Sequence, residues 1–360
     1  MYASLGLDSL TAPQASVIFA LALGLVFGVL AERTGFCFRR SLVGSDRRAA
    51  MGVWLTALAA AVLGTQAAVA AGWIGFADHR FLASDLPLAA ILLGGALFGA
   101  GMVLTRGCVS RLTVLSGTGN LRALLVLVAF AIVAHATLKG VLAPLRTAIG
   151  GVTVPIGEAA SLAALPGGAP VWAGLIAVAA LAVALRSGNG AGRLAMAAAL
   201  GLLVPLGWVG TGFVLYDDFD PVALQSLSFT APTADMLFWL VASTSIPAGF
   251  GAGLVGGVLA GSLASSLAFR SFRWQSFDSP AQTGRYLAGA ALMGVGGVLA
   301  GGCTVGAGLS GLPTLSVAAI LALAAIAAGG LAMQAALPRL TPAGRESAGS
   351  PTTRQPQPAE

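Results

Sequence analysis

GALFGAGMVLTRGC at residues 95–108 and GAALMGVGGVLAGGC at residues 289–303 are two apolar stretches that repeat each other, each ending in a cysteine. An LSG follows each cysteine, at 115–117 and 309–311, and another long apolar segment comes after it. Earlier in the chain, ALGLVFGVLAERTGF at 22–36 is similar to ALGLLVPLGWVGTGF at 199–213. Such self-similarity, in the same order along the chain, indicates two related halves. Seven residues of the first stretch have identical counterparts 195 positions later: Ala96, Leu97, Gly99, Gly101, Val103, Leu104 and Gly107.

The composition is that of an integral membrane protein. Hydrophobic residues make up 57% of the 360, charged residues only 9%, and the mean hydropathy is +0.90. The apolar segments lack the alternation of an outer-membrane barrel, so they are expected to be helices. The predicted fold is all-α and polytopic, with about nine spans. They cover residues 16–31, 49–72, 87–104, 121–139, 170–185, 193–210, 247–269, 284–300 and 314–336.

Glycine is unusually abundant, with 50 residues, and many lie inside the spans. Gly95 and Gly99 are four residues apart, as are Gly253, Gly257 and Gly261. This small-xxx-small spacing lets two helix backbones approach closely. We therefore expect these glycines at helix crossings.

The distribution of the basic residues predicts how the chain is oriented in the membrane. All but three of the nineteen Lys and Arg fall on one face of the nine-span map, and the exceptions are Arg80, Lys139 and Arg146. The positive-inside rule then predicts an N-terminus outside and a C-terminus in the cytoplasm. Because these charges are scattered one loop at a time, the pI near 10 does not indicate a nucleic-acid partner.

This topology makes the repeat an inverted one. The span before Cys108 runs inward and its counterpart before Cys303 runs outward, an arrangement that places substrate sites near the membrane midplane. The predicted units are a first half at 1–150, an outer connecting loop at 151–168, and a second half at 169–337. A disordered cytoplasmic tail rich in Pro, Ser, Thr and Gln is expected at 338–360.

The three cysteines, Cys37, Cys108 and Cys303, all lie in glycine-marked breaks between apolar segments. At such a break the chain can start a half-helix, whose N-terminal N–H groups favour an anion. A thiol is a weak, soft hydrogen-bond donor that suits a polarisable sulfur anion and still permits its release. The alternative interpretation is that each cysteine is simply a small buried hydrophobe.

Other residues complete the predicted site. Gly35, Gly107 and Gly302 would let the backbone approach a ligand closely, and Thr304 follows Cys303 directly. Arg106 and Arg111 flank Cys108, either as attractors of a dianion at an exit or as positive-inside anchors.

The sequence gives no sign of a metal or cofactor site. With no CxxC or CxxH and only two histidines, we expect neither a metal site nor a cofactor. Five tryptophans near predicted span ends are interpreted as interfacial belt residues. They are Trp54, Trp73, Trp208, Trp239 and Trp274.

The paired GC motifs with their LSG, the RTGFC at 33–37 and the run from Phe272 to Gly311 resemble the YeeE/YedE family of sulfur-transport membrane proteins. The resemblance implies an hourglass-shaped bundle of full spans and short membrane-dipping helices in the bacterial inner membrane. It also implies import of thiosulfate along central cysteines, which match Cys37, Cys108 and Cys303. In that mechanism the anion passes between S–H donors without covalent chemistry, and a TusA-like cytosolic sulfur carrier is a common partner.

Other functions remain open on the sequence. A membrane thiol enzyme, either a sulfurtransferase or a disulfide-forming oxidoreductase, would use the same cysteines covalently, although no paired-cysteine motif supports it. A non-catalytic anchor could recruit a soluble sulfur carrier. Within the transport class, a selenium-containing anion would meet the same chemistry as a sulfur one.

Overall fold

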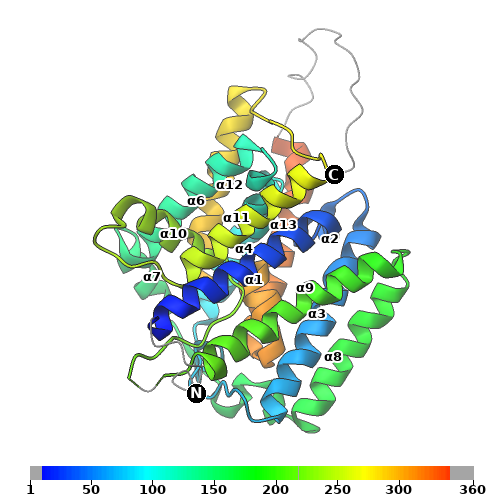
Figure 1. Cartoon of the computed structure of the whole chain (residues 1–360), viewed down its shortest axis with the longest axis vertical. Helices are drawn as coiled ribbons and strands as arrows, with labels where there is room; N and C mark the ends of the chain where they lie inside the picture. The colour runs from blue at the N-terminus through cyan, green and yellow to red at the C-terminus, as the bar shows by residue number, and fades with distance from the viewer. Residues whose placement is uncertain (1–9, 218, 341–360) are drawn as a thin grey trace.

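The computed structural model describes residues 10–217 and 219–340, and it is about 74% helical with almost no strand. The first helices along the chain are α1 (Ala12–Thr34), α2 (Phe38–Val43), α3 (Arg47–Ala70), α4 (Leu88–Leu104), α5 (Val109–Gly117), α6 (Leu121–Lys139) and α7 (Ala143–Gly150). They are followed by α8 (Gly168–Leu185), α9 (Ala191–Val209), α10 (Thr230–Ala242), α11 (Phe250–Ala268), α12 (Pro280–Leu299) and α13 (Val317–Leu340) (Figure 1).

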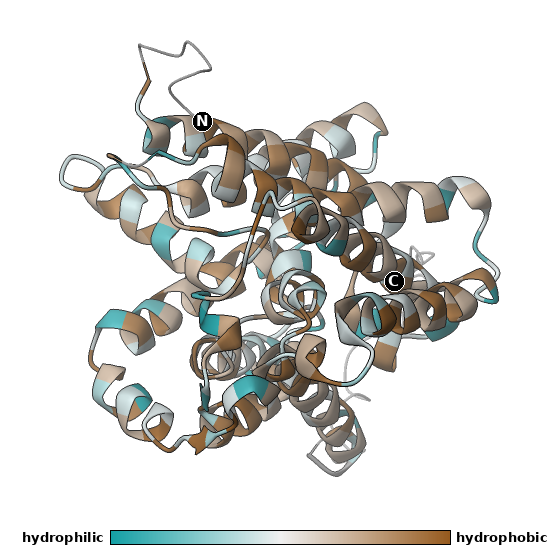
Figure 2. Ribbon diagram, turned by 90° about the horizontal axis from the view of Figure 1, so that it is seen from below, coloured by the Kyte–Doolittle hydropathy of each residue, from teal (hydrophilic) through white to brown (hydrophobic). Residues whose placement is uncertain are grey.

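The prediction of an all-α membrane fold is confirmed. Within the described residues, nine helical segments are long and apolar enough to cross a membrane, and they match the nine predicted spans one for one. The ribbon of the long helices is mostly hydrophobic, while hydrophilic residues gather at helix ends and in the connections (Figure 2). Three segments are longer than predicted, because a break and a second short helical piece follow the span; they cover Ala12–Val43, Leu88–Gly117 and Pro280–Thr314.

The long helices pair in a reciprocal way. The most extensive contacts join α1 to α11 and α4 to α13, and their counterparts join α9 to α3 and α12 to α6. If α9 corresponds to α1 and α12 to α4, as the repeat suggests, every one of these pairs takes one helix from each half. The two halves are therefore interlocked in one bundle (Figure 1). Their boundaries and their opposite orientation remain predictions.

Glycines make these crossings possible, as predicted. A Cβ built on Gly257 would lie 2.2 Å from the Leu21 carbonyl oxygen, and one built on Gly24 would lie 2.2 Å from the Leu254 carbonyl oxygen. In the second pair, a Cβ on Gly99 would lie 2.1 Å from the Ile326 carbonyl oxygen. Since real Cβ atoms do not come this close to a backbone oxygen, the helices touch backbone to backbone.

The connections carry short elements. The segment after α6 contains α7, a strand β2 (Val154–Pro155) that pairs antiparallel with β1 (Asp85–Leu86), and two 3₁₀ turns. Helix α10 was not among the predicted spans, and at 13 residues it is too short to cross a bilayer. The tail is predicted to start at residue 338, but Pro338–Leu340 still belong to α13. Residues 341–360 lie outside the described part of the chain.

His79 is packed into the loop between α3 and α4. Its ring centroid lies 4.8 Å from that of Phe81 and 5.3 Å from that of Trp208, and its Nδ1 accepts a hydrogen bond from the Phe81 backbone N–H (3.3 Å). Burial and the neighbouring Arg80 lower the pKa of His79 to about 4. The imidazole is therefore neutral at physiological pH.

Gly257→Ala tests the backbone contact between α1 and α11. We expect it to destabilise the protein by about 1–3 kcal/mol, because the new methyl group must push α1 away. The matched control is Gly256→Ala on the same helix, whose Cβ would meet only the Met236 Cε at 3.9 Å. Thermal unfolding of the purified protein in detergent measures both variants. Equal melting temperatures for the two would contradict the assigned crossing.

His79→Gln tests the neutral imidazole. The unfolded chain binds a proton near pH 6.5, whereas the folded protein binds it only near pH 4, so the wild type loses stability as the pH falls through this window. We expect the drop in melting temperature between pH 7 and pH 4.5 to be smaller in the variant. An identical drop in both proteins would show that His79 is not held neutral by the fold.

Candidate functional site

All three cysteines lie at the N-cap of a short helical piece. Cys37 precedes α2, Cys108 precedes α5, and Cys303 precedes η6, a π-helical segment at Thr304–Gly311. The three side chains are buried, with exposed fractions of 5%, 1% and 0%. The breaks that the sequence indicated therefore do start new helical pieces inside the protein.

The same backbone turn precedes each cysteine. Two positions earlier the chain adopts the left-handed conformation, at Gly35 (φ 66°), Arg106 (φ 59°) and Gly301 (φ 73°). This conformation costs a non-glycine residue roughly 1–2 kcal/mol, so Arg106 occupies a position that suits glycine better. At Cys108 and Cys303 the left-handed residue is therefore not the predicted glycine, Gly107 or Gly302, but the residue directly before it. Gly302 instead packs against the chain that follows, where a Cβ would lie 2.9 Å from the Ala307 backbone nitrogen.

The polar groups around the sulfur atoms form a small network. The side chains of Cys37 and Cys108 are close enough to interact with each other, and Cys108 Sγ is 3.3 Å from Ser110 Oγ. Cys303 Sγ accepts a hydrogen bond from the Gly306 backbone N–H (3.4 Å). The Thr304 hydroxyl is adjacent to Cys108, is 1% exposed, and meets no well-aligned partner among the described residues.

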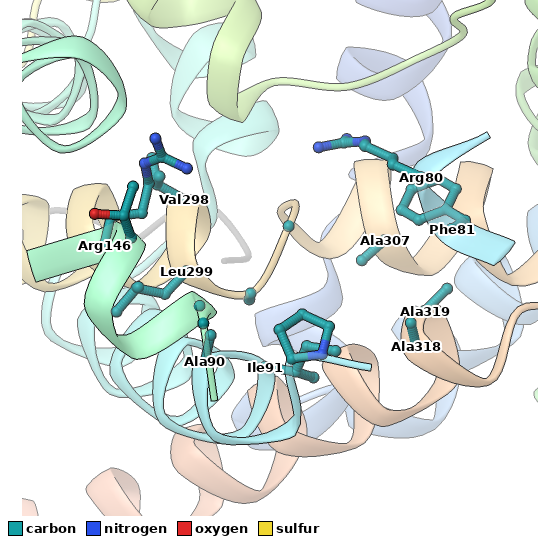
Figure 3. A pocket seen from close by; sticks show the side chains of 16 residues that line it. Arg80, Phe81, Ala90, Ile91, Arg146, Val298, Leu299, Ala307, Ala318 and Ala319 are labelled. Carbon is teal, nitrogen blue, oxygen red and sulfur yellow. The ribbon is translucent and has the colours of Figure 1, made fainter. Parts of the chain in front are cut away.

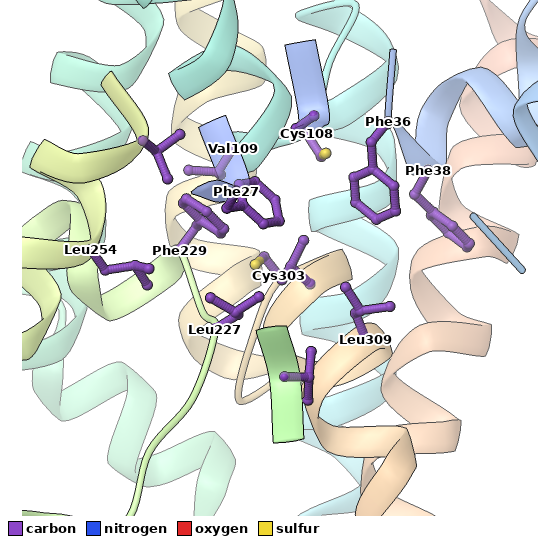
Figure 4. Packing of buried hydrophobic residues seen from close by; sticks show 14 of the residues in the cluster. Phe27, Phe36, Phe38, Cys108, Val109, Leu227, Phe229, Leu254, Cys303 and Leu309 are labelled. Atoms are coloured by element: carbon purple, nitrogen blue, oxygen red, sulfur yellow. The ribbon is translucent and has the colours of Figure 1, made fainter. Parts of the chain in front are cut away.

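Aromatic and aliphatic side chains surround Cys108 and Cys303 (Figure 4). The ring centroid of Phe27 lies 6.1 Å from that of Phe36 and 5.3 Å from that of Phe229. Figure 4, which draws buried hydrophobic residues, shows the rings of Phe27 and Phe229 beside the two sulfur atoms. We call these closely packed, buried side chains around Cys108 and Cys303 the narrow layer.

On the arginine-rich face of the molecule, a cavity of about 440 Å³ reaches Cys37. Its charged lining residues are Glu32, Arg39, Arg40, Arg106, Arg111 and Arg122. We call this space the inner vestibule, because the positive-inside rule predicts that this face is cytoplasmic. Two of its arginines are already paired, Arg40 with Asp46 and Arg122 with Asp278. The Arg40 guanidinium lowers the pKa of the Asp46 carboxyl.

The two predicted arginines beside Cys108 occupy different places in the inner vestibule. Arg106 is exposed at its wall, while Arg111 is partly buried and donates through Nη1 to the Ala31 carbonyl oxygen at 3.5 Å. Arg111 also lies close enough to Cys37 and Cys108 to interact electrostatically with both sulfur atoms. Of the two, Arg111 is therefore the cation nearest the cysteines.

A second cavity, of about 690 Å³, has a different set of walls and is called the outer vestibule here. It is lined by His79, Arg80 and Trp208, and it ends on Gly306 and Ser310 of η6, the segment that Cys303 caps. The two vestibules approach the cysteine layer through different residues, one reaching Cys37 and the other η6.

Trp208 corrects one sequence interpretation. Its side chain is only 2% exposed and Trp54 only 3%, so neither is a belt residue, whereas Trp73 (50%) and Trp274 (72%) are exposed as expected. The Trp208 Nε1 has no hydrogen-bond partner among the described residues, which leaves a buried donor in the outer vestibule. Sequence reasoning missed this role because Trp208 lies close to a span end, where a belt residue is the usual interpretation.

Among the described residues, no cluster of His, Cys, Asp and Glu could hold a metal ion. The geometry offers instead weak and unpartnered hydrogen-bond donors in a narrow layer between two cavities. Such a layer is suited to passing a small anion rather than to holding it tightly.

Comparison with known proteins agrees with this description. No curated protein matches the chain. The family model described as sulphur transport matches residues 33–332, far more than half of the sequence, including all three cysteines. The chain belongs to this family, the YeeE/YedE family of sulphur-transport membrane proteins.

Proposed function

We propose that this membrane sulphur transporter imports thiosulfate, which passes Cys303, Cys108 and Cys37 in turn by weak hydrogen bonds. The observation that carries the proposal is the position of the three thiols. They are buried at helix breaks between a vestibule that ends on η6 and a vestibule that reaches Cys37. In this role the protein acts as a transporter and not as an enzyme.

The chemistry of the narrow layer favours transit. An S–H group is a weak donor, so each contact with the anion is modest and the anion can leave for the next site. The Thr304 hydroxyl and the Trp208 N–H supply two further donors that have no partner among the described residues. Buried donors without partners are uncommon in folded proteins, and a passing anion would satisfy them.

The charges on the two sides support inward movement. The outer vestibule is lined by one cation and one anion, Arg80 and Asp78, whereas the inner vestibule is lined by five arginines and a single acidic residue, Glu32. The proposed location is the bacterial inner membrane with the N-terminus outside and the C-terminus in the cytoplasm. An inside-negative potential opposes a dianion by roughly 4–5 kcal/mol per 100 mV. Cytosolic removal of sulfur, for example by a TusA-like carrier at the inner face, would offset this cost.

One contact favours a second candidate function. Because the Cys37 and Cys108 side chains are close enough to interact, a covalent route is chemically reasonable at the same place: one thiolate would attack the outer sulfur of thiosulfate, which forms a persulfide and releases sulfite. A thiol sulfurtransferase or oxidoreductase would use it. The covalent route requires the cysteine sulfur atom itself, whereas the hydrogen-bonding route requires only a side chain that donates a hydrogen bond.

Cys108→Ala and Cys303→Ala test the proposed path. Each removes a hydrogen bond to an anion, which is worth about 1.5–3 kcal/mol, so we expect uptake to fall by at least ten-fold. The assay is uptake of radiolabelled thiosulfate into liposomes that contain only this protein, with selenium-containing anions and sulfite as competitors. Ser262→Ala on α11 is the control, since it removes a buried hydroxyl that bonds only within its own helix. Wild-type uptake by both cysteine variants would refute the path.

Cys108→Ser separates the two routes. A hydroxyl still donates a hydrogen bond but cannot form a persulfide, so we expect uptake between those of the wild type and the alanine variant, less than about ten-fold below the wild type. Mass spectrometry of the wild type, alkylated during turnover, should then find no added sulfur on any cysteine. An inactive serine variant together with a trapped persulfide would favour the enzyme.

A further inference from the structure

A third cavity, shown in Figure 3, lies beside the Cys303 break, because Gly301 and Ala307 line it. Its volume is about 500 Å³, and its walls come from α7, the start of α4, the end of α12 and the start of α13. Most of the lining is aliphatic, including Ile91, Val298 and Leu299. We call it the lateral pocket. It shares Arg80 and Phe81 with the outer vestibule, and the proposed transport route uses no other part of it.

Two arginines give the lateral pocket a positive rim. Figure 3 shows Arg80 and Arg146 on opposite sides of the pocket, with the apolar side chains between and below them. No acidic residue is among the residues that line it. The Arg146 Nε is buried and has no hydrogen-bond partner among the described residues. A buried guanidinium nitrogen without an acceptor indicates that an anionic group is missing from this place.

Helix α7 places this pocket at a membrane surface. None of its residues is buried, and the neighbouring Val141 and Leu145 are 87% and 53% exposed. A short helix that presents apolar side chains outward while carrying Arg146 is typical of an interfacial helix, which lies at the level of the lipid headgroups. The pocket beneath it is then within reach of bilayer lipid.

We propose that the lateral pocket binds an anionic phospholipid. The phosphate accepts hydrogen bonds from Arg146 and Arg80, and the upper part of an acyl chain fills the apolar space between α4, α12 and α13. The occupant must combine one negative headgroup with a long apolar body, because the pocket has both features. A small sulfur dianion would satisfy the two guanidinium groups but would leave the aliphatic walls uncovered.

The position of the pocket links the lipid to the cysteine break. Gly301, the left-handed residue before Cys303, and Ala307 of η6 both line the lateral pocket. A lipid bound there packs against the outside of the segment that holds Cys303. The proposal itself concerns lipid binding, and it stands or falls independently of the substrate.

The experiment measures lipid binding by the purified, delipidated full chain. Native mass spectrometry and thermal unfolding in a neutral detergent compare phosphatidylglycerol with phosphatidylcholine of the same chains, and with thiosulfate and inorganic phosphate alone. We expect phosphatidylglycerol to bind and to raise the melting temperature more than phosphatidylcholine does. Arg146→Gln should weaken phosphatidylglycerol binding by about five-fold, as expected for one basic residue at a lipid headgroup.

Two matched pairs of variants make the result specific. Arg47→Gln removes an exposed arginine that lies outside the pocket, and it should leave lipid binding unchanged. Gly150→Leu fills the pocket from α7, where a Cβ meets nothing within 4 Å, and Gly174→Leu is the equally open control on α8. Only Gly150→Leu should block phosphatidylglycerol. Equal binding of the two lipids, an unaffected Arg146→Gln variant, or stabilisation by the small anions alone would overturn the proposal.

Discussion

The satisfaction of backbone polar groups inside a membrane is the constraint on which this structure depends. A chain that breaks its helix at membrane depth exposes N–H and C=O groups that lipid cannot satisfy, so each break must be enclosed by protein. The close crossings of α1 with α11 and of α4 with α13 provide this enclosure, because glycines such as Gly257 and Gly99 bring the backbones into contact. Every residue of η6 is buried as a result.

Cysteine is a weaker N-cap than the residues that usually occupy this position. Serine, threonine or aspartate would accept hydrogen bonds from the first N–H groups of the helix and hold them. Cys108 makes no such bond to α5, and Cys303 makes only a 3.4 Å contact through sulfur to Gly306. Sulfur is a weaker acceptor than a hydroxyl or carboxylate oxygen, so the N–H groups at the start of these segments are held only weakly by the cap and could turn to an anion that passes the thiol.

Much of this fold could be predicted from the sequence, since hydropathy and glycine spacing report the helices and their contacts directly. The positions of the three breaks were also predictable, because Cys37, Cys108 and Cys303 sit between apolar segments. The contact between Cys37 and Cys108 was not, because it depends on how α2 and α5 fold back into the bundle. The burial of Trp208 was hidden for a similar reason, as the loop that carries His79 covers it only in three dimensions.

The apolar lining around Cys303 bears on which anions can cross the narrow layer. Arginines line the inner vestibule, Asp78 and Arg80 line the outer one, and Arg111 approaches Cys37 and Cys108, whereas Figure 4 shows apolar side chains such as Leu227 and Phe229 packed around Cys303. An anion entering this layer loses water and gains only weak donors, so its desolvation cost decides whether it enters. That cost is smaller for an anion whose charge is spread onto a large, polarisable sulfur atom than for one whose charge is held on oxygen alone. Selectivity for reduced sulfur anions over sulfate would then follow from the apolar lining of the narrow layer as well as from its thiols.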